Sequence, residues 1–269
     1  MKRLINQKPS SAFAWALGLL PIIALLVLYI VASDARLAIN PADKLLPSFA
    51  SMQESIARMA FEPSKRTGEY LLWTDTFSSL KRLGLGMLIA AMVGLVVGIS
   101  TGAIPYLSAT LSPLLTIISL IPCLALLPIL FIVMGLGELS KVSLIVIGIT
   151  PFIAREIQQR AREIPAEQLI KAQTLGANSA QIISCVLLPQ LLPKLINAVR
   201  MSLGTGWLFL IAAEAIASTD GLGYRIFLVR RYLSMDVIIP YVAWITLLAF
   251  ILDWLLRKLK RRLFPWELA

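Results

Sequence analysis

Long uncharged apolar stretches alternate with short polar segments along the chain. No Asp, Glu, Lys or Arg occurs in residues 9–33 or in the 55 residues from 83 to 137. A membrane-spanning helix needs roughly 20 apolar residues, so the second stretch is long enough for two spans. The pattern predicts six spans, at residues 13–31, 83–104, 108–134, 142–154, 195–218 and 237–256. We therefore predict an all-α, polytopic transmembrane helical bundle that forms a single domain over residues 1–269.

The first and fourth predicted spans leave alternatives open. Small residues at Ala32 and Ser33 would suit cleavage of a signal peptide. The preceding apolar stretch is longer than the 7–15 residues of a signal-peptide core, which favours an uncleaved span. The fourth stretch, Val142 to Ala154, is short for a span. We expect its helix to extend into the flanking polar residues, or to tilt less than its neighbours.

The third predicted span contains interior prolines, and the second is rich in glycine. The third contains Pro113, Pro122 and Pro128, which interrupt the helical hydrogen-bond ladder and are tolerated where neighbours or a cavity satisfy the freed carbonyls. In the second, Gly94 and Gly98 form a G-x-x-x-G pair, which lets helix backbones approach closely in lipid. We predict that this pair packs within the protein.

Basic residues at the two ends of the chain predict its orientation. Three precede the first span and five lie in residues 257–262, so both termini are expected in the cytoplasm. Six spans then make residues 155–194 a cytoplasmic loop and residues 34–82 an external polar segment. The external segment has seven Lys/Arg, which is more than the positive-inside rule favours outside. We keep this orientation because the basic clusters at the two ends of the chain indicate the same side. Within it, apolar residues at 49, 52, 56 and 59 predict an amphipathic helix, on the membrane surface or against neighbouring spans.

Composition limits the chemistry. Hydrophobic residues make up 58% of the chain and charged residues 15%, and there is no histidine. Histidine-based catalysis, metal binding and proton relays are thereby excluded. Cys123 and Cys185 form no C-x-x-C pair, so no metal site is predicted. The net charge of +10 is attributed to basic cytoplasmic segments rather than to nucleic-acid binding.

The predicted cytoplasmic loop contains a helix–turn–helix pattern. An amphipathic helix from Ala166 ends at Gly176, and a second helix ends at Leu188-Pro189. Glycine after a helix permits the left-handed cap conformation, so Gly176 predicts a sharp turn. Such a knob suits insertion into a groove on another protein; an ordinary cytoplasmic loop is the alternative.

Here the sequence resembles the membrane subunits of bacterial ABC importers. Gly176, followed after nine residues by Val186-x-Leu188-Pro189, is similar to their signature loop, the EAA loop. The similarity covers roughly residues 72–256. Further pieces resemble the nitrate/sulfonate/taurine branch: Trp73-x-Asp75-Thr76-Phe77, Ile121-Pro122, Ala212-Ala-Glu214 and Gly221-Leu-Gly-Tyr224. The chain departs from the family where Ile170-Lys171-Ala172 replaces Glu-Ala-Ala, and Glu167 stands one turn too early to substitute.

The resemblance implies a type I ABC importer permease in the bacterial cytoplasmic (inner) membrane. Two membrane subunits, such as two copies of this chain, form the pathway for a small solute, and two cytoplasmic ATPase subunits bind the loops. A periplasmic or lipid-anchored binding protein delivers the solute. The chain has no G-x-x-x-x-G-K-[ST] phosphate-binding loop. ATP and magnesium are therefore expected on the ATPase, with no cofactor and no enzyme activity in this chain.

The same resemblance implies roles for individual residues. ATPase docking falls on Leu169, Lys171, Ala172, Gln173, Leu175, Gly176 and Ala177. The loop signature falls on Val186, Leu188 and Pro189.

Glu214 is an isolated carboxylate in the uncharged residues 201–219. A charge at the centre of a spanning helix costs about 2.5–3.5 kcal/mol on insertion scales, so it faces a cavity or a partner. Two interpretations stay open: Glu214 lines or gates the solute path, or it makes a structural hydrogen bond to a neighbouring helix. Asp253 is expected to pair with Arg257, and Arg225 is expected in a solvated outer loop.

The leading hypothesis is thus an importer permease for nitrate, sulfonate, taurine or a similar small nitrogen or sulfur compound. An ion-coupled secondary transporter is the alternative, but it predicts further intramembrane carboxylates and an internal repeat, and neither is found. A membrane-embedded enzyme is disfavoured by the lack of histidine and of clustered carboxylates in the spans.

Overall fold

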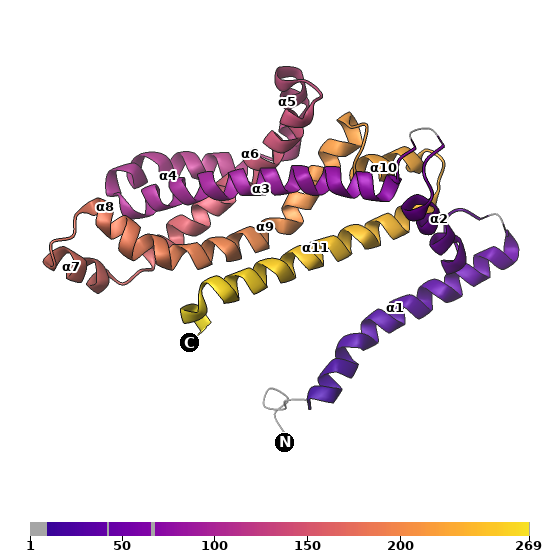
Figure 1. Cartoon of the computed structure of the whole chain (residues 1–269), viewed down its shortest axis with the longest axis horizontal. Helices are drawn as coiled ribbons and strands as arrows, with labels where there is room; N and C mark the ends of the chain where they lie inside the picture. The colour runs from indigo at the N-terminus through magenta and orange to yellow at the C-terminus, as the bar shows by residue number, and fades with distance from the viewer. Residues whose placement is uncertain (1–9, 42, 66–67, 269) are drawn as a thin grey trace.

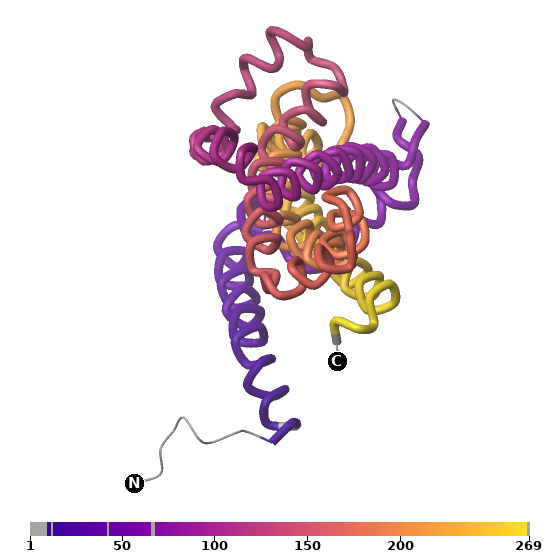
Figure 2. Tube along the Cα trace, turned by 90° about the vertical axis from the view of Figure 1, so that its left-hand side faces the viewer, coloured from indigo at the N-terminus to yellow at the C-terminus, as the bar shows by residue number. Residues whose placement is uncertain are grey.

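The computed structural model describes residues 10–41, 43–65 and 68–268, and within these ranges the chain forms helices joined by short turns (Figure 1). Most of the long helices lie along a common direction, the N-terminal one diverges from them (Figure 2), and most of the short helices lie at the two ends of the bundle. The basic residues at positions 2–8, which contribute to the predicted orientation, lie outside the described ranges. The long helices are α1 (Ser11–Ile39), α3 (Leu71–Ala103), α6 (Glu138–Arg162), α9 (Leu188–Ala217) and α11 (Met235–Leu263).

The core is the contact between α3 and α6, which lie side by side over most of their length. Glycines on α3 allow this approach, because an added Cβ would come within 2.7 Å of α6 atoms at each of four positions: Gly86, Gly94, Gly98 and Gly102. Ile145, Ile149, Ile153 and Ile157 of α6 are fully buried there. The predicted packing of Gly94 and Gly98 within the protein is confirmed.

The third predicted span is broken in the middle. Helix α4 (Pro105–Leu120) is followed by a 3₁₀ turn, η2 (Cys123–Leu126), and by α5 (Leu127–Met134), and the two halves are bent by 82°. The break falls at Ile121-Pro122, because a proline cannot continue the helical ladder and restricts the residue before it. In Figure 1, α5 consequently projects away from the bundle.

The predicted loop at residues 155–194 is mostly helical, which corrects the sequence expectation. Helix α6 continues to Arg162, α7 (Ala166–Thr174) follows, and α8 (Ser179–Gln181) runs through a π-helical turn, η3 (Ile182–Leu187), into α9. The second helix therefore does not end at Leu188-Pro189. In the π-helical turn the N–H groups instead bond to the carbonyl five residues earlier, as from Leu188 to Ile183, and this accommodates the missing N–H of Pro189.

Helix α1 lies apart from the bundle, whereas the next helix packs against the bundle. The most apolar part of α1 is only 6% buried, and α1 is held by Tyr29, whose hydroxyl donates to the Pro47 carbonyl at 2.7 Å. Helix α2 (Phe49–Phe61) matches the predicted amphipathic helix. It packs against α11, where Ser55 donates to Asp236 at 2.6 Å. The neighbouring-span alternative for this helix is therefore the observed one.

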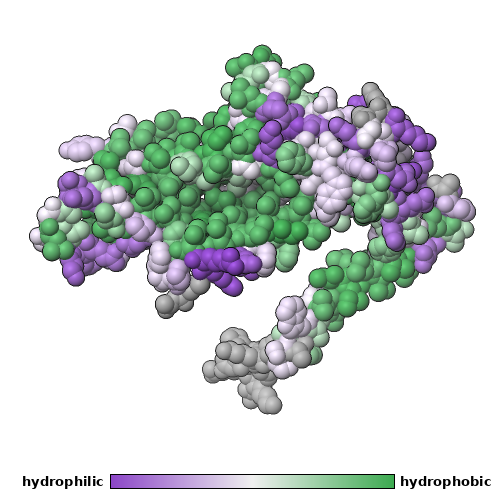
Figure 3. Space-filling model, viewed as in Figure 1, coloured by the Kyte–Doolittle hydropathy of each residue, from purple (hydrophilic) through white to green (hydrophobic). Residues whose placement is uncertain are grey.

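The apolar surface agrees with a membrane protein. Figure 3 shows a hydrophobic band along the middle of the bundle and polar residues gathered at both ends. Four helices of the described chain are long and apolar enough to span, with the bent pair as a fifth. Helix α6, the predicted fourth span, is not among these helices, so six spans are more than this criterion finds in the described residues. It extends the apolar residues 142–154 into charged residues at both ends, which is one of the two expected alternatives. Helix α10 (Leu222–Arg230) and η4 (Pro265–Leu268) complete the fold.

Candidate functional site

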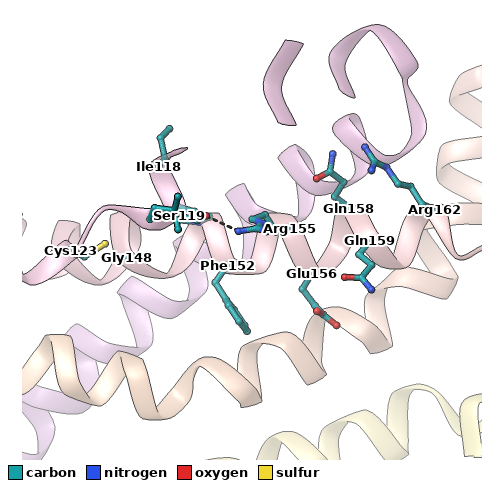
Figure 4. Close-up of a pocket in the computed structure, with 12 residues that line it drawn as sticks. Ile118, Ser119, Cys123, Gly148, Phe152, Arg155, Glu156, Gln158, Gln159 and Arg162 are labelled. Atoms are coloured by element: carbon teal, nitrogen blue, oxygen red, sulfur yellow. Dashed lines mark hydrogen bonds between the residues drawn. The ribbon is translucent and has the colours of Figure 1, made fainter. Parts of the chain in front are cut away.

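A cavity of about 590 Å³ opens between α4, η2 and α6 (Figure 4). Its walls combine apolar residues with arginines and glutamines from α6. The lining residues are Ile118, Ser119, Leu120, Cys123, Gly148, Pro151, Phe152, Arg155, Glu156, Gln158, Gln159 and Arg162. This volume is in the range of small-molecule sites.

Two matching polar rows border the cavity. On α6, Arg155, Gln158 and Arg162 are three and seven residues apart and thus share a face. On α4, serines at 108, 112 and 119 share a face for the same reason. The antiparallel rows meet in register: Arg155 donates to Ser119 at 2.8 Å, Gln158 to Ser112 at 2.6 Å, and Arg162 to Ser108. Figure 4 shows the first contact.

A second cavity, of about 450 Å³, continues from the first towards α9. The two share Ser119, Cys123, Gly148 and Phe152. The second is more apolar and reaches Met201, Thr205 and Phe209 of α9. Gly148 keeps this region compact, because a Cβ there would lie 2.2 Å from the Phe209 ring. Together the cavities run from the end of α6 that precedes α7 to the break in the third span.

A buried ion cluster occupies the opposite end of the bundle. Arg82 of α3, with a side chain 3% exposed, donates to Glu214 at 2.8 Å, to Glu138 at 2.6 Å and to Asp220 at 2.6 Å. Lys141 lies 3.0 Å from Glu138. Arg82 thereby joins α3, the start of α6, α9 and the turn after α9.

The start of α10 is capped by side chains from other helices. The N–H of Gly221 donates to Asp75, that of Leu222 to the Ser79 hydroxyl, and that of Gly223 to Glu214, each within 3.0 Å. Gly221 has φ +114°, and a Cβ at this position would lie 2.5 Å from the Glu214 carboxylate. Only glycine fits here. The Glu214 carboxylate thus accepts hydrogen bonds from a backbone N–H group and from Arg82.

Arg225 and Asp220 are part of the same end. Arg225 forms an ion pair with Asp75 at 2.8 Å, and its side chain is 14% exposed, so the expectation of a solvated outer loop was wrong for it. Burial acts to raise the pKa of Asp220, but hydrogen bonds from Ser78 and Arg82 outweigh it and hold that pKa below its usual value. Asp220 therefore stays charged in the cluster.

Glu214 is fully buried and is held by Arg82, Ser79 and the Gly223 N–H. It lines neither of the two cavities described above. These contacts favour the structural interpretation over the pathway interpretation, which stays a prediction. The expected pair between Asp253 and Arg257 is confirmed, and Asp253 also accepts from Arg200 at 2.8 Å.

Helix α7 ends in a Schellman motif at the predicted glycine. The Gly176 N–H donates to the Gln173 carbonyl at 2.9 Å and the Ala177 N–H to the Ala172 carbonyl at 3.0 Å, which is the paired bonding of this cap. Gly176 has φ +86°. The cap turns the chain sharply and leaves Leu175 80% exposed.

The predicted docking residues divide between two faces. Lys171, Gln173, Leu175 and Gly176 are exposed, whereas Ala172 and Ala177 are half-buried. Leu169 packs against the core and anchors α7 to the bundle. The signature residues Val186, Leu188 and Pro189 are half-buried in η3 and at the start of α9, so they shape the turn.

Sequence reasoning missed three functional candidates. Ile170 on α7 is 57% exposed and lies beside the predicted docking residues. Arg155 was assigned to a loop, although its place three and seven residues before Gln158 and Arg162 was a readable helical signal. Arg82 stood at the edge of the predicted polar segment, and no pattern along the chain indicated its burial.

These features define a class: a polytopic membrane transport subunit, with a polar-lined cavity at a broken span and a short helix displayed at one end. The family described as "Binding-protein-dependent transport system inner membrane component" matches residues 69–265. The chain belongs to this family of multi-pass inner-membrane proteins and is an ABC transporter permease rather than an enzyme. This assignment sets aside the secondary-transporter alternative.

Similar proteins of known family membership indicate the branch of the family to which the chain belongs. It is 37% identical over 196 residues to the taurine transport system permease protein TauC of Escherichia coli (strain K12), covering 73% of this chain and 71% of the relative. It is 31% identical to the putative aliphatic sulfonates transport permease protein SsuC of Bacillus subtilis (strain 168), covering 70% and 68%. The predicted nitrate/sulfonate/taurine branch is thus confirmed.

The fold matches solved permeases. A chain of the MetNI methionine ABC transporter in an inward-facing conformation superposes with a TM-score of 0.65 at 24% identity, covering 74% of this chain and 98% of that one. A chain of an amino acid ABC transporter gives a TM-score of 0.58 at 18% identity, with coverage of 80% and 99%. The predicted type I importer permease fold is confirmed.

Proposed function

We propose that the chain forms the translocation pathway of an ATP-driven importer for a small solute of the nitrate, sulfonate or taurine type, and that α7 couples it to a separate ATPase. Two copies of the permease, two ATPase subunits and a solute-binding protein make up the complex. ATP and magnesium bind the ATPase. The taurine and sulfonate names of the relatives support this solute class.

Helix α7 lies at the end of the bundle and is the basis of the proposed coupling to the ATPase. Its exposed apolar side chains, Ile170 and Leu175, stand at the end of the bundle beyond the hydrophobic band. A short helix with protruding apolar residues suits a groove on a partner protein. Leu169 and the Schellman cap at Gly176 fix the direction of the helix, so a movement of the partner would be passed to α6 and α9.

In this arrangement the α7 end faces the cytoplasm. Helix α11 ends on the same side as α7, and its last turn carries Lys260, Arg261 and Arg262, in agreement with the positive-inside rule. The ion cluster around Arg82 then lies at the outer end, next to the external segment. The first basic cluster, before α1, is expected on the cytoplasmic side as well.

Leu175→Asp tests the coupling. The residue is 80% exposed, so the variant should fold, while a charge in an apolar groove should release the ATPase. With this chain co-expressed with a partner ATPase and a solute-binding protein, we expect co-purification of the ATPase to fall at least about tenfold. The matched control is Leu263→Asp, which alters an exposed leucine at the end of α11. An ATPase that stays bound to Leu175→Asp would refute the docking role.

Uptake tests the transport proposal. Vesicles holding the complete complex should accumulate radiolabelled taurine only with ATP and the binding protein present. Ethanesulfonate should compete if the solute class is right. No uptake of taurine, nitrate or alkanesulfonates by the intact complex would refute the assigned class.

A further inference from the structure

We infer that Arg155, with Ser119 beside it, is an anion-binding site inside the first cavity. The solute's negatively charged group would contact this site as it crosses. The transport role rests on the proposed function, whereas the anion site rests on the charges and geometry of the cavity alone.

The first observation is that Arg155 has no counter-charge. Among the described residues, no carboxylate lies within ion-pair distance of Arg155; its recorded partner is the Ser119 hydroxyl, at 2.8 Å. Glu156, which lines the same cavity, is paired with Arg160 at 2.9 Å. Glu163 is paired with Arg160 as well. The cavity therefore keeps a net positive charge.

The second observation is the depth of Arg155. Its partner Ser119 is next to the break in the third span and within the uncharged residues 83–137. Arg155 is two helical turns, about 10 Å, inside the Arg162 end of α6. Charged side chains within a membrane are costly and commonly pair or line a solute path. A guanidinium whose recorded bond is to one hydroxyl keeps free N–H groups for a ligand.

The third observation is the chemistry of the cavity. An arginine fork binds planar or multi-oxygen anions through two parallel hydrogen bonds. The amide of Gln158 donates to Ser112 and to the Thr101 carbonyl and so positions α4 against α6, whereas Arg162 offers a second cation nearer the α7 end of the same face. The ligand class is a small oxyanion group such as sulfonate, carboxylate or nitrate. Phe152, exposed in both cavities, provides an apolar wall for the rest of the solute.

Cys123 lines the same cavity and can report the local potential without any transport. Cys185→Ser leaves it as the chain's one thiol. In vesicles of the full complex, the rates of Cys123 labelling by two methanethiosulfonates would be compared, one carrying a sulfonate and one a trimethylammonium. The positive charge of Arg155 attracts the sulfonate reagent and repels the trimethylammonium reagent. Arg155→Gln should therefore lower the ratio of the sulfonate rate to the trimethylammonium rate at least about threefold.

Two further variants make this test specific. Arg155→Lys keeps the charge and should keep the ratio. Arg261→Gln removes an equal charge from the exposed last turn of α11, outside the cavity, so it should change the ratio less than Arg155→Gln does. An unchanged ratio in Arg155→Gln would overturn the anion site, as would an equal change in Arg261→Gln.

A measurement without any variant at position 155 covers the case in which Arg155→Gln does not assemble. In the Cys185→Ser protein, excess ethanesulfonate should slow labelling of Cys123 by neutral N-ethylmaleimide, whereas propanamide should not. Equal effects of the two would overturn the inference. Uptake separates the two proposals: failure of all uptake in the wild-type complex refutes the proposed function, and the labelling ratio still decides the anion site.

Discussion

The arginines at the two ends of the bundle differ in their burial and in the partners that they bind. At the α10 end, Arg82 is 3% exposed and ion-paired with Glu214, Glu138 and Asp220. In the cavity near α7, Arg155 is exposed and its recorded partner is a hydroxyl. Both residues lie on the helices that form the core, α3 and α6. The difference therefore comes from their partners and not from the elements that carry them.

The comparison separates structural charge from available charge. All the hydrogen bonds of the buried Arg82 guanidinium go to its neighbours, and removing this cation leaves the fully buried Glu214 without a counter-charge. Removing a cation that is bonded to a hydroxyl costs the protein little stability, because no anion loses its counter-charge. The first arrangement holds helices in place, and the second leaves hydrogen-bond donors free for a solute.

The largest expected effect follows from removing Arg82. Arg82→Met leaves Glu214 fully buried without its counter-charge, which costs about 3–5 kcal/mol of stability. We expect a strong loss of folded protein, measured as monodisperse protein after detergent extraction and as melting temperature. Arg160→Met, which removes an exposed paired arginine, is the control. A melting temperature for Arg82→Met equal to that of the control would contradict the structural role.

A smaller effect is expected for Glu214→Gln. The amide keeps one acceptor but turns an N–H₂ group towards donors that now bond both carboxylate oxygens, from Arg82, Ser79 and Gly223. Loss of one charged hydrogen bond costs about 1–3 kcal/mol. The melting temperature should lie between those of Arg82→Met and the wild type. If a stable, fully assembled variant nevertheless loses uptake, the pathway role of Glu214 would gain support over the structural one.

The smallest effect on stability is expected at Arg155. Arg155→Met loses a bond to Ser119 and no ion pair, so its free energy of unfolding should stay within about 0.5 kcal/mol of the wild type. Uptake of taurine should nevertheless fall at least about tenfold, as the anion site requires. Arg155→Met should thus keep its thermal stability and lose uptake, whereas Arg82→Met should lose thermal stability. A large drop in melting temperature would show that Arg155 is also structural.

The sequence predicted most of the spans because their signals are local, whereas the predicted fourth span, in α6, is not among the helices that are apolar enough to cross a membrane. Uncharged runs, the prolines around Ile121-Pro122 and the glycines at 94 and 98 each act through neighbours along the chain or through one adjacent helix. The Schellman turn at Gly176 could be foreseen for the same reason. The predicted loop at residues 155–194 was wrong because charged residues were taken to end the span, although α6 carries Arg155 and Arg162 on a face that meets serines of α4.

What the sequence determined by itself is the class of molecule: a histidine-free helical membrane protein without a phosphate-binding loop, carrying the turn at Gly176. What only the tertiary structure decided is the role of each charge. Glu214, Asp75 and Arg82 lie in separate segments and meet because α3 packs against α6 and α9. Electrostatic energy depends on distance and burial, and neither quantity is contained in the spacing of charged residues along the chain.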